Sequence, residues 1–104
     1  MAILRRRVTY NERMQFADLP GGDLVEQGLR DLAAGAESDA ALLVLIGSPR
    51  LRSLGIDVPA SDLRRPEHRL YERLARTDSD SAHSRYNALI RRLVSFERAA
   101  ECAR

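Results

Sequence analysis

Five arginines lie close together in the third quarter of the chain: Arg64, Arg65, Arg69, Arg73 and Arg76. Steps of three and four residues place the last four on one face of a helix. Guanidinium groups in such a row could contact the phosphates of a nucleic acid or an acidic surface on a protein partner. The alternative is a solvated helix face, on which Glu67 and Glu72 neutralise part of the positive charge.

A second basic cluster, Arg5-Arg6-Arg7, lies near the start of the chain. These three side chains could also contact phosphates. The alternative is a solvated chain end, since terminal residues are often poorly ordered. Residues 1–10 are therefore predicted to form a flexible or extended arm, and a first helical turn is the alternative for residues 3–10.

Arg76 and His83 are the residues that could take part in catalysis, with mostly polar residues between them. This pattern resembles the active-site motif of the HEPN family, small helical-bundle proteins that include ribonucleases. The resemblance implies an RNA-cleaving site, where Arg76 would stabilise charge on a phosphate and His83 would act as acid or base. Thr77 stands where the family has Asn, Asp or His, and residues 78–81 predict a turn where the family has helix. Alternatively, His83 is an incidental residue in the first turn of a helix.

Other residues that could do chemistry lack partners at the required spacing. His68 and Glu72 could place two metal ligands on one helix face, but no third ligand follows at a recognisable distance. Asp78 and Asp80 are interpreted as helix-capping groups, and Gly21-Gly22 lacks the strand and the lysine of a phosphate-binding loop. We expect no metal and no cofactor, and the sequence favours a protein that is not an enzyme.

The composition is typical of a soluble, folded single domain. The chain has 104 residues, 44% hydrophobic and 31% charged, which is enough to build one core. All 17 basic residues are arginine, and 15 acidic residues leave a net charge of +2. Such a small excess supports nucleic-acid binding only weakly. The absence of lysine is typical of a GC-rich genome.

The sequence also predicts a compartment. Cys102 is the single cysteine, which excludes an intrachain disulfide and indicates a reducing environment. Met1–Arg7 places its arginines after a very short apolar patch, so no secretory signal is predicted. The longest apolar run, residues 40–46, is too short to span a bilayer. We predict a cytoplasmic protein of bacterial type that has no membrane contact.

Proline, glycine and small polar residues divide the rest of the chain into predicted helices. The predicted ranges are Glu12–Leu19, Asp23–Ala34, Asp39–Ile46, Arg50–Leu54 and a helix that begins at Pro66 and runs through Arg76. Ser38 is the predicted N-cap of the third range. That range is apolar all round, so it could be a buried strand or a central helix. The absence of any partner strand favours the helix, with Leu43 in the core.

The strongest periodicity lies in the last quarter of the chain. Asp78–Ser81 predicts a helix start, and a long helix follows without glycine or proline. Its apolar residues recur at steps of three and four: Ala82, Tyr86, Leu89, Ile90, Leu93, Phe96 and Ala100. Such a stripe requires other elements to cover it.

These observations predict an all-α fold: residues 1–104 form one compact bundle of about five helices with a long C-terminal helix. The function favoured by the sequence is a non-catalytic helical interaction module that binds a protein partner or a second copy of itself as a dimer. Nucleic-acid binding through the Arg64–Arg76 face is the alternative. An HEPN-like enzyme using Arg76 and His83 is a lesser alternative.

Overall fold

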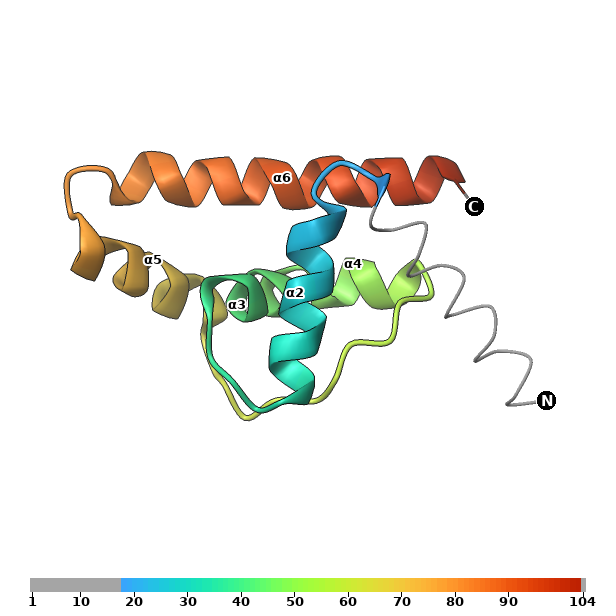
Figure 1. Cartoon of the computed structure of the whole chain (residues 1–104), viewed down its shortest axis with the longest axis horizontal. Helices are drawn as coiled ribbons and strands as arrows, with labels where there is room; N and C mark the ends of the chain where they lie inside the picture. The colour runs from blue at the N-terminus through green and yellow to red at the C-terminus, as the bar shows by residue number, and fades with distance from the viewer. Residues whose placement is uncertain (1–17, 104) are drawn as a thin grey trace.

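The computed structural model describes residues 18–103, and five helices lie within that range (Figure 1). They are α2 (Gly22–Ala33), α3 (Asp39–Ile46), α4 (Ser48–Ser53), α5 (Pro66–Thr77) and α6 (Ala82–Ala103). No residue from 18 to 103 is in a strand. The predicted all-α globule with a long C-terminal helix is confirmed. The predicted arm at residues 1–10, including Arg5–Arg7, and most of the predicted Glu12–Leu19 helix lie outside the described residues.

Helix α3 occupies the centre of this globule. Residues 40–44 are buried, and Leu43 has no exposed surface. Helix α3 packs mainly on α2 and α5, and it also contacts α4 and α6. Figure 1 shows α6 lying along one side of the molecule, with the N-terminal end of α2 beside it and the rest of α2 running away from it across α3. The predicted central position of the apolar helix is confirmed.

The connection between α2 and α3 is fixed by the predicted cap. The Ser38 hydroxyl accepts a hydrogen bond from the backbone N–H of Ala41 at 3.0 Å, which satisfies a free donor in the first turn of α3. The same hydroxyl donates to the Asp31 carboxylate on α2 at 2.6 Å. This hydrogen bond, together with one from Gln27, lowers the pKa of Asp31. One serine therefore begins α3 and ties it to the last turns of α2.

Two glycines allow α2 to approach its neighbours closely. At Gly28, an added Cβ would lie 2.3 Å from the backbone oxygen of Ala40 and 2.5 Å from Val44 Cγ2. Helices α2 and α3 therefore cross closely at this position. At Gly21, which has a φ of +73°, an added Cβ would lie 2.6 Å from the backbone oxygen of Arg92. The start of α2 thus rests directly on the backbone of α6.

Helix α6 is covered unevenly along its 22 residues. Leu93, Phe96 and Ala100, in its C-terminal half, are at most 5% exposed. Tyr86, Leu89 and Ile90, in the preceding turns, are only partly buried. The helix begins at Ala82, at the end of the predicted start region, because the Asp78 carboxylate accepts the N–H of Asp80 at 3.1 Å and holds a turn there.

The Glu97 carboxylate on α6 provides a pH-dependent contribution to stability. An added Cβ at Gly47 would lie 3.0 Å from Glu97 Oε2, so the carboxyl group is against the α3–α4 junction. Burial raises the pKa of Glu97 above its ordinary value of 4.5, although Arg50 nearby acts in the opposite direction. The folded state therefore binds this proton more tightly than the unfolded chain does.

We predict that Glu97→Gln raises the melting temperature at neutral pH and leaves it nearly unchanged at acid pH. The stability that protonation gives the wild type is fully present below pH 4.5 and is lost as pH rises through the folded pKa. Glutamine cannot ionise, so the variant does not lose this stability as pH rises. Thermal melts across this pH range measure the effect, with Asp57→Asn, in an exposed loop position, as the control. A lower melting temperature of Glu97→Gln at neutral pH contradicts the prediction.

Candidate interaction surface on α5 and α6

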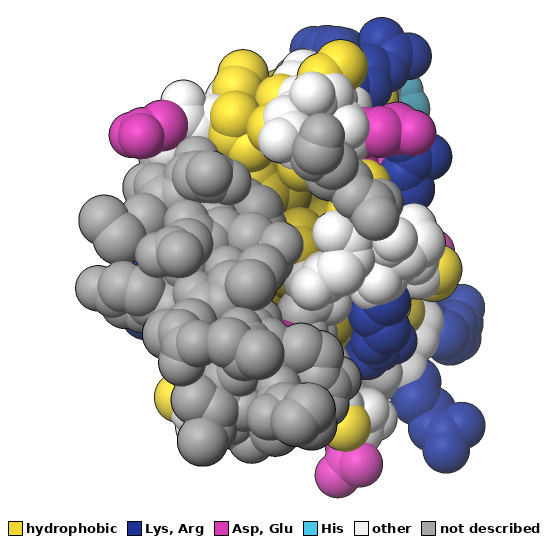
Figure 2. Space-filling model, turned by 90° about the vertical axis from the view of Figure 1, so that its right-hand side faces the viewer, with side chains coloured by type: hydrophobic (Ala, Val, Ile, Leu, Met, Phe, Trp, Pro, Cys, Tyr) yellow, Lys and Arg dark blue, Asp and Glu magenta, His cyan; other side chains and the backbone are white. Residues whose placement is uncertain are grey.

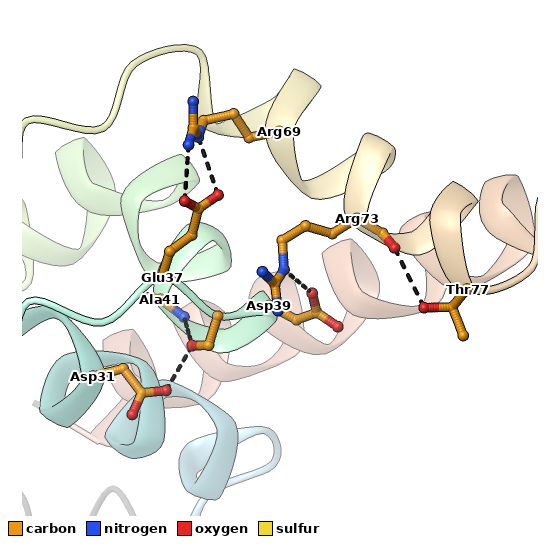
Figure 3. A network of polar contacts seen from close by, with 8 residues as sticks. Asp31, Glu37, Asp39, Ala41, Arg69, Arg73 and Thr77 are labelled. Atoms are coloured by element: carbon orange, nitrogen blue, oxygen red, sulfur yellow. Dashed lines mark hydrogen bonds and ion pairs between the residues drawn. The ribbon is translucent and has the colours of Figure 1, made fainter.

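Two arginines of the predicted row hold α5 against the α2–α3 connection (Figure 3). Arg69 donates to both carboxylate oxygens of Glu37, at 2.8 and 3.1 Å. Arg73 donates through Nε to Asp39, in the first turn of α3, at 2.8 Å. The hydrogen bond from Arg69 lowers the pKa of Glu37. These two guanidinium groups therefore have structural partners inside the fold.

The other three arginines of the row have no such partner within residues 18–103. Arg64, Arg65 and Arg76 are exposed, and no ion pair joins them to an acidic residue in that range. Arg65 is the residue before α5 and has a positive φ of 52°. Two arginines of the row therefore form ion pairs within the fold, and the other three are exposed to solvent. Its role in binding a partner or a nucleic acid stays a prediction.

The end of the molecule where α6 finishes is seen in Figure 2, where every dark blue side chain is an arginine because the chain has no lysine. Arginine side chains are spread along one edge of this view, with uncharged and acidic side chains between them. Exposed basic residues therefore also lie outside the α5 row, and they include Arg91, Arg92 and Arg98 on α6.

His83 contacts groups other than Arg76 in the structure. Its Nε2 lies 3.3 Å from Asn87 Nδ2, and its ring meets the Tyr71 ring edge-on, with centroids 6.5 Å apart. Tyr71 and Arg76 are separated by about 140° around α5, because each helical residue turns about 100°. The ring contact therefore places His83 beside the face of α5 that carries Tyr71, and Arg76 lies on a different face of that helix. An RNA-cleaving role for this pair stays a prediction.

The remaining candidates for chemistry lie at the surface. His68 and Glu72 form an exposed pair at 3.2 Å, one turn apart on α5. Within residues 18–103, no three His, Cys, Asp or Glu side chains come together closely enough to hold a metal ion. The thiol of Cys102 is exposed near the end of α6.

Two surface features flank the contact between α5 and α6, one on each side. Leu89 and Ile90 lie on opposite sides of the buried Leu93. Leu89 is four positions before Leu93 and Ile90 is three, and these two steps fall on either side of a line along the helix. On the Ile90 side, Tyr71 packs on Tyr86 with ring centroids 5.9 Å apart. Tyr71 is 40% exposed and is the only large hydrophobic side chain exposed in the described range. Helical spacing from the buried Leu70 and Leu74 predicts Tyr71 on the apolar face of α5, and its exposure shows that this prediction is wrong.

On the Leu89 side, the start of α3 meets α5 and α6 in a groove of about 290 Å³, which we call the α6 groove. Its lining consists of Asp39, Leu74, Arg85, Ala88, Leu89 and Arg92. Leu74, Ala88 and Leu89 form an apolar centre between the two arginines. Arg85 and Arg92 lie off the apolar stripe of α6, and the sequence alone provided no reason to assign them a role. Their spacing of seven residues, with Ala88 and Leu89 between, was the signal that could have indicated this arrangement.

Comparison with known protein families, with characterised proteins and with solved structures finds no match to this chain. None of the helices described between residues 18 and 103 combines the length and the apolar character needed to cross a membrane. The function proposed below consequently depends on the geometry of the chain itself.

Proposed function

We propose that this protein is a small helical interaction module that binds another protein chain through the α5–α6 hairpin. The binding surface is the α6 groove on one side and the Tyr71–Tyr86 pair on the other, which together we call the hairpin surface. The bound chain is either a different protein or a second copy of this one. In this proposal the protein itself carries out no chemical reaction.

The incomplete cover over residues 86–90 of α6, between the buried Ala82 and Leu93, is the observation that carries this proposal. Leu93 and Phe96 are 4% and 0% exposed, whereas Leu89 and Tyr86, one to two turns earlier on the same helix, remain partly exposed. Protein–protein interfaces have an apolar centre and are enriched in tyrosine and arginine, the residue types found here. A partner would cover the part of the stripe that α5 leaves open.

The ion pairs of α5 favour a protein partner over a nucleic acid. Arg69 and Arg73, in the middle of the basic row, already bind carboxylates of the same chain. Contact with phosphates through these two residues would first require breaking those pairs. The hairpin surface, by contrast, offers apolar area, and the ion pair at its edge, Arg92–Asp23, is exposed to solvent and therefore weak.

We expect substitutions on the hairpin surface to abolish association and leave the fold intact. Tyr71→Glu and Ala88→Glu each place a charge at an exposed position on one side of α6. Ala60→Glu, in the exposed loop before α5, is the matched control because it adds the same charge elsewhere. Sedimentation velocity measures self-association, and quantitative affinity capture from cells of the source organism measures association with other proteins.

The expected result is that the wild type and Ala60→Glu form the same complexes, and that at least one hairpin variant loses them. Circular dichroism melts must show that the variants remain folded. If all four proteins are strictly monomeric at high concentration and recover identical sets of proteins, the hairpin surface is not an interaction site and the proposal is wrong.

A further inference from the structure

We propose that the α6 groove binds an amphipathic helix of a different protein, one that carries acidic side chains two turns apart. This inference depends on the proposed function, since it names the occupant of one side of the hairpin surface. Three features of the groove support it: its shape, its positive charge, and the like-charge contacts that a symmetric dimer would create there.

The groove has the shape for one or two apolar side chains of a helix. Its volume of about 290 Å³ is just below the range for ligand pockets, roughly 300 to 1,000 Å³, and suits a few side chains rather than a whole ligand. Leu74, 2% exposed, closes the bottom of the groove from α5. Ala88 lies between the arginines and is exposed, and its small side chain lets a second helix approach α6 closely.

The two arginines give the groove its selectivity. Arg85 and Arg92 are seven residues apart, which places them on one face of α6 with a rise of about 10.5 Å between them. A helix lying along α6 would meet both if its own acidic residues were also seven apart. Arginine is well suited to this role, because its planar guanidinium binds carboxylates through two parallel hydrogen bonds.

The charges already near the groove leave it net positive. Arg73 binds the Asp39 carboxylate at 2.8 Å, and Asp23 accepts a hydrogen bond from Arg92 at 3.0 Å. The Asp23 side chain is 77% exposed, so this pair is screened by solvent. Within residues 18–103, no acidic side chain pairs with Arg85. Arg85 therefore offers a half-buried cation to an incoming carboxylate.

A second copy of the chain is a poor occupant of the same groove. A twofold axis that pairs the two α6 helices about the Ala88–Leu89 position places Arg85 of one copy opposite Arg92 of the other. Every such contact occurs twice in a twofold interface, so two pairs of like charges would face each other. Juxtaposed like charges disfavour a partner strongly. The groove is thus better matched to a chain of opposite charge.

The experiment uses nuclear magnetic resonance titration of the isotope-labelled full chain with three synthetic helical peptides. All three share one leucine-containing apolar face, and they carry glutamate, glutamine or lysine at two positions seven residues apart. We expect the glutamate peptide to bind at least about tenfold more tightly than the lysine peptide, since close charge pairs change affinity by a kcal/mol or more. The largest shifts should lie in residues 85–92 and around Leu74.

A charge-reversal variant tests whether the peptide binds at the groove or elsewhere on α6. In Arg85→Glu, the preference should invert, so that the lysine peptide binds more tightly than the glutamate peptide. Arg98→Glu is the matched control, because it removes the same charge from the same helix at a position outside the groove. This variant should keep the preference for glutamate.

Two outcomes overturn the inference. The first is equal binding of the three peptides, or shifts that centre away from the groove. The second is a dimer of the wild type that Ala88→Glu dissociates, which would make a second copy the occupant. In the second case the proposed function stands and only the inference fails. If Tyr71→Glu loses association and the three peptides bind the wild type equally, the inference is likewise wrong, and the proposed function again stands.

Discussion

Leu43→Asp is expected to abolish folding of the protein. Leu43 lies in the middle of α3 with no exposed surface, and α3 packs mainly on α2 and α5. Loss of a buried leucine side chain costs about 2–5 kcal/mol. A carboxylate left without a partner in that position adds several kcal/mol more. Because small domains have a total stability of about 5–15 kcal/mol, the sum is comparable with the whole free energy of unfolding.

Far-ultraviolet circular dichroism and thermal unfolding of purified Leu43→Asp measure this effect. The wild type should show a strongly helical spectrum and a cooperative transition, and the variant should show neither. Leu45→Asp is the matched control, since Leu45 lies on the same helix but is only partly buried, so its carboxylate can reach water. It should lose stability yet remain folded. A cooperative transition near the wild-type temperature in Leu43→Asp contradicts the assignment of α3 as the core.

The fold could be predicted because its determinants are local in the sequence. Ser38 precedes an apolar run, Pro66 lies at the first position of α5, and the residues of α6 repeat at helical steps. Each of these features acts within one or two turns, where backbone hydrogen bonding and helix periodicity determine the outcome. The identity of α3 as the central helix followed from its lack of any polar face.

The candidate site could not be predicted in the same way, because it depends on distances between elements. Arg73 and Asp39 are 34 residues apart in the chain, and nothing in the spacing of the arginines indicates that carboxylates lie beside them. The α6 groove brings together residues of α3, α5 and α6. Tyr71 occupies an apolar position of α5 that the periodicity assigns to the interior. Whether such a position is covered depends on how the neighbouring helices are placed, which helix spacing alone does not determine.

Gly28→Ala is expected to destabilise the protein, although alanine is the better helix former. In a helix interior open to solvent, this substitution gains about 1 kcal/mol. At Gly28 the new methyl group would overlap the Ala40 backbone oxygen, at 2.3 Å, and Val44 Cγ2, at 2.5 Å. A backbone oxygen cannot rotate away, so α2 and α3 must move apart. Overpacking of this kind costs about 1–3 kcal/mol or more. The steric cost therefore exceeds the gain in helix propensity.

The melting temperature decides between the two effects, because they have opposite signs. Each kcal/mol lost lowers the melting temperature of a domain of this size by about 4–8 °C, so Gly28→Ala should melt several degrees below the wild type. Ala33→Gly, at an exposed position of the same helix, measures propensity without a clash and should lose up to about 1 kcal/mol. If helix propensity alone determined both effects, Gly28→Ala would raise the free energy of unfolding by about as much as Ala33→Gly lowers it. A rise in the melting temperature of Gly28→Ala would mean that α2 and α3 do not cross as closely as the structure places them.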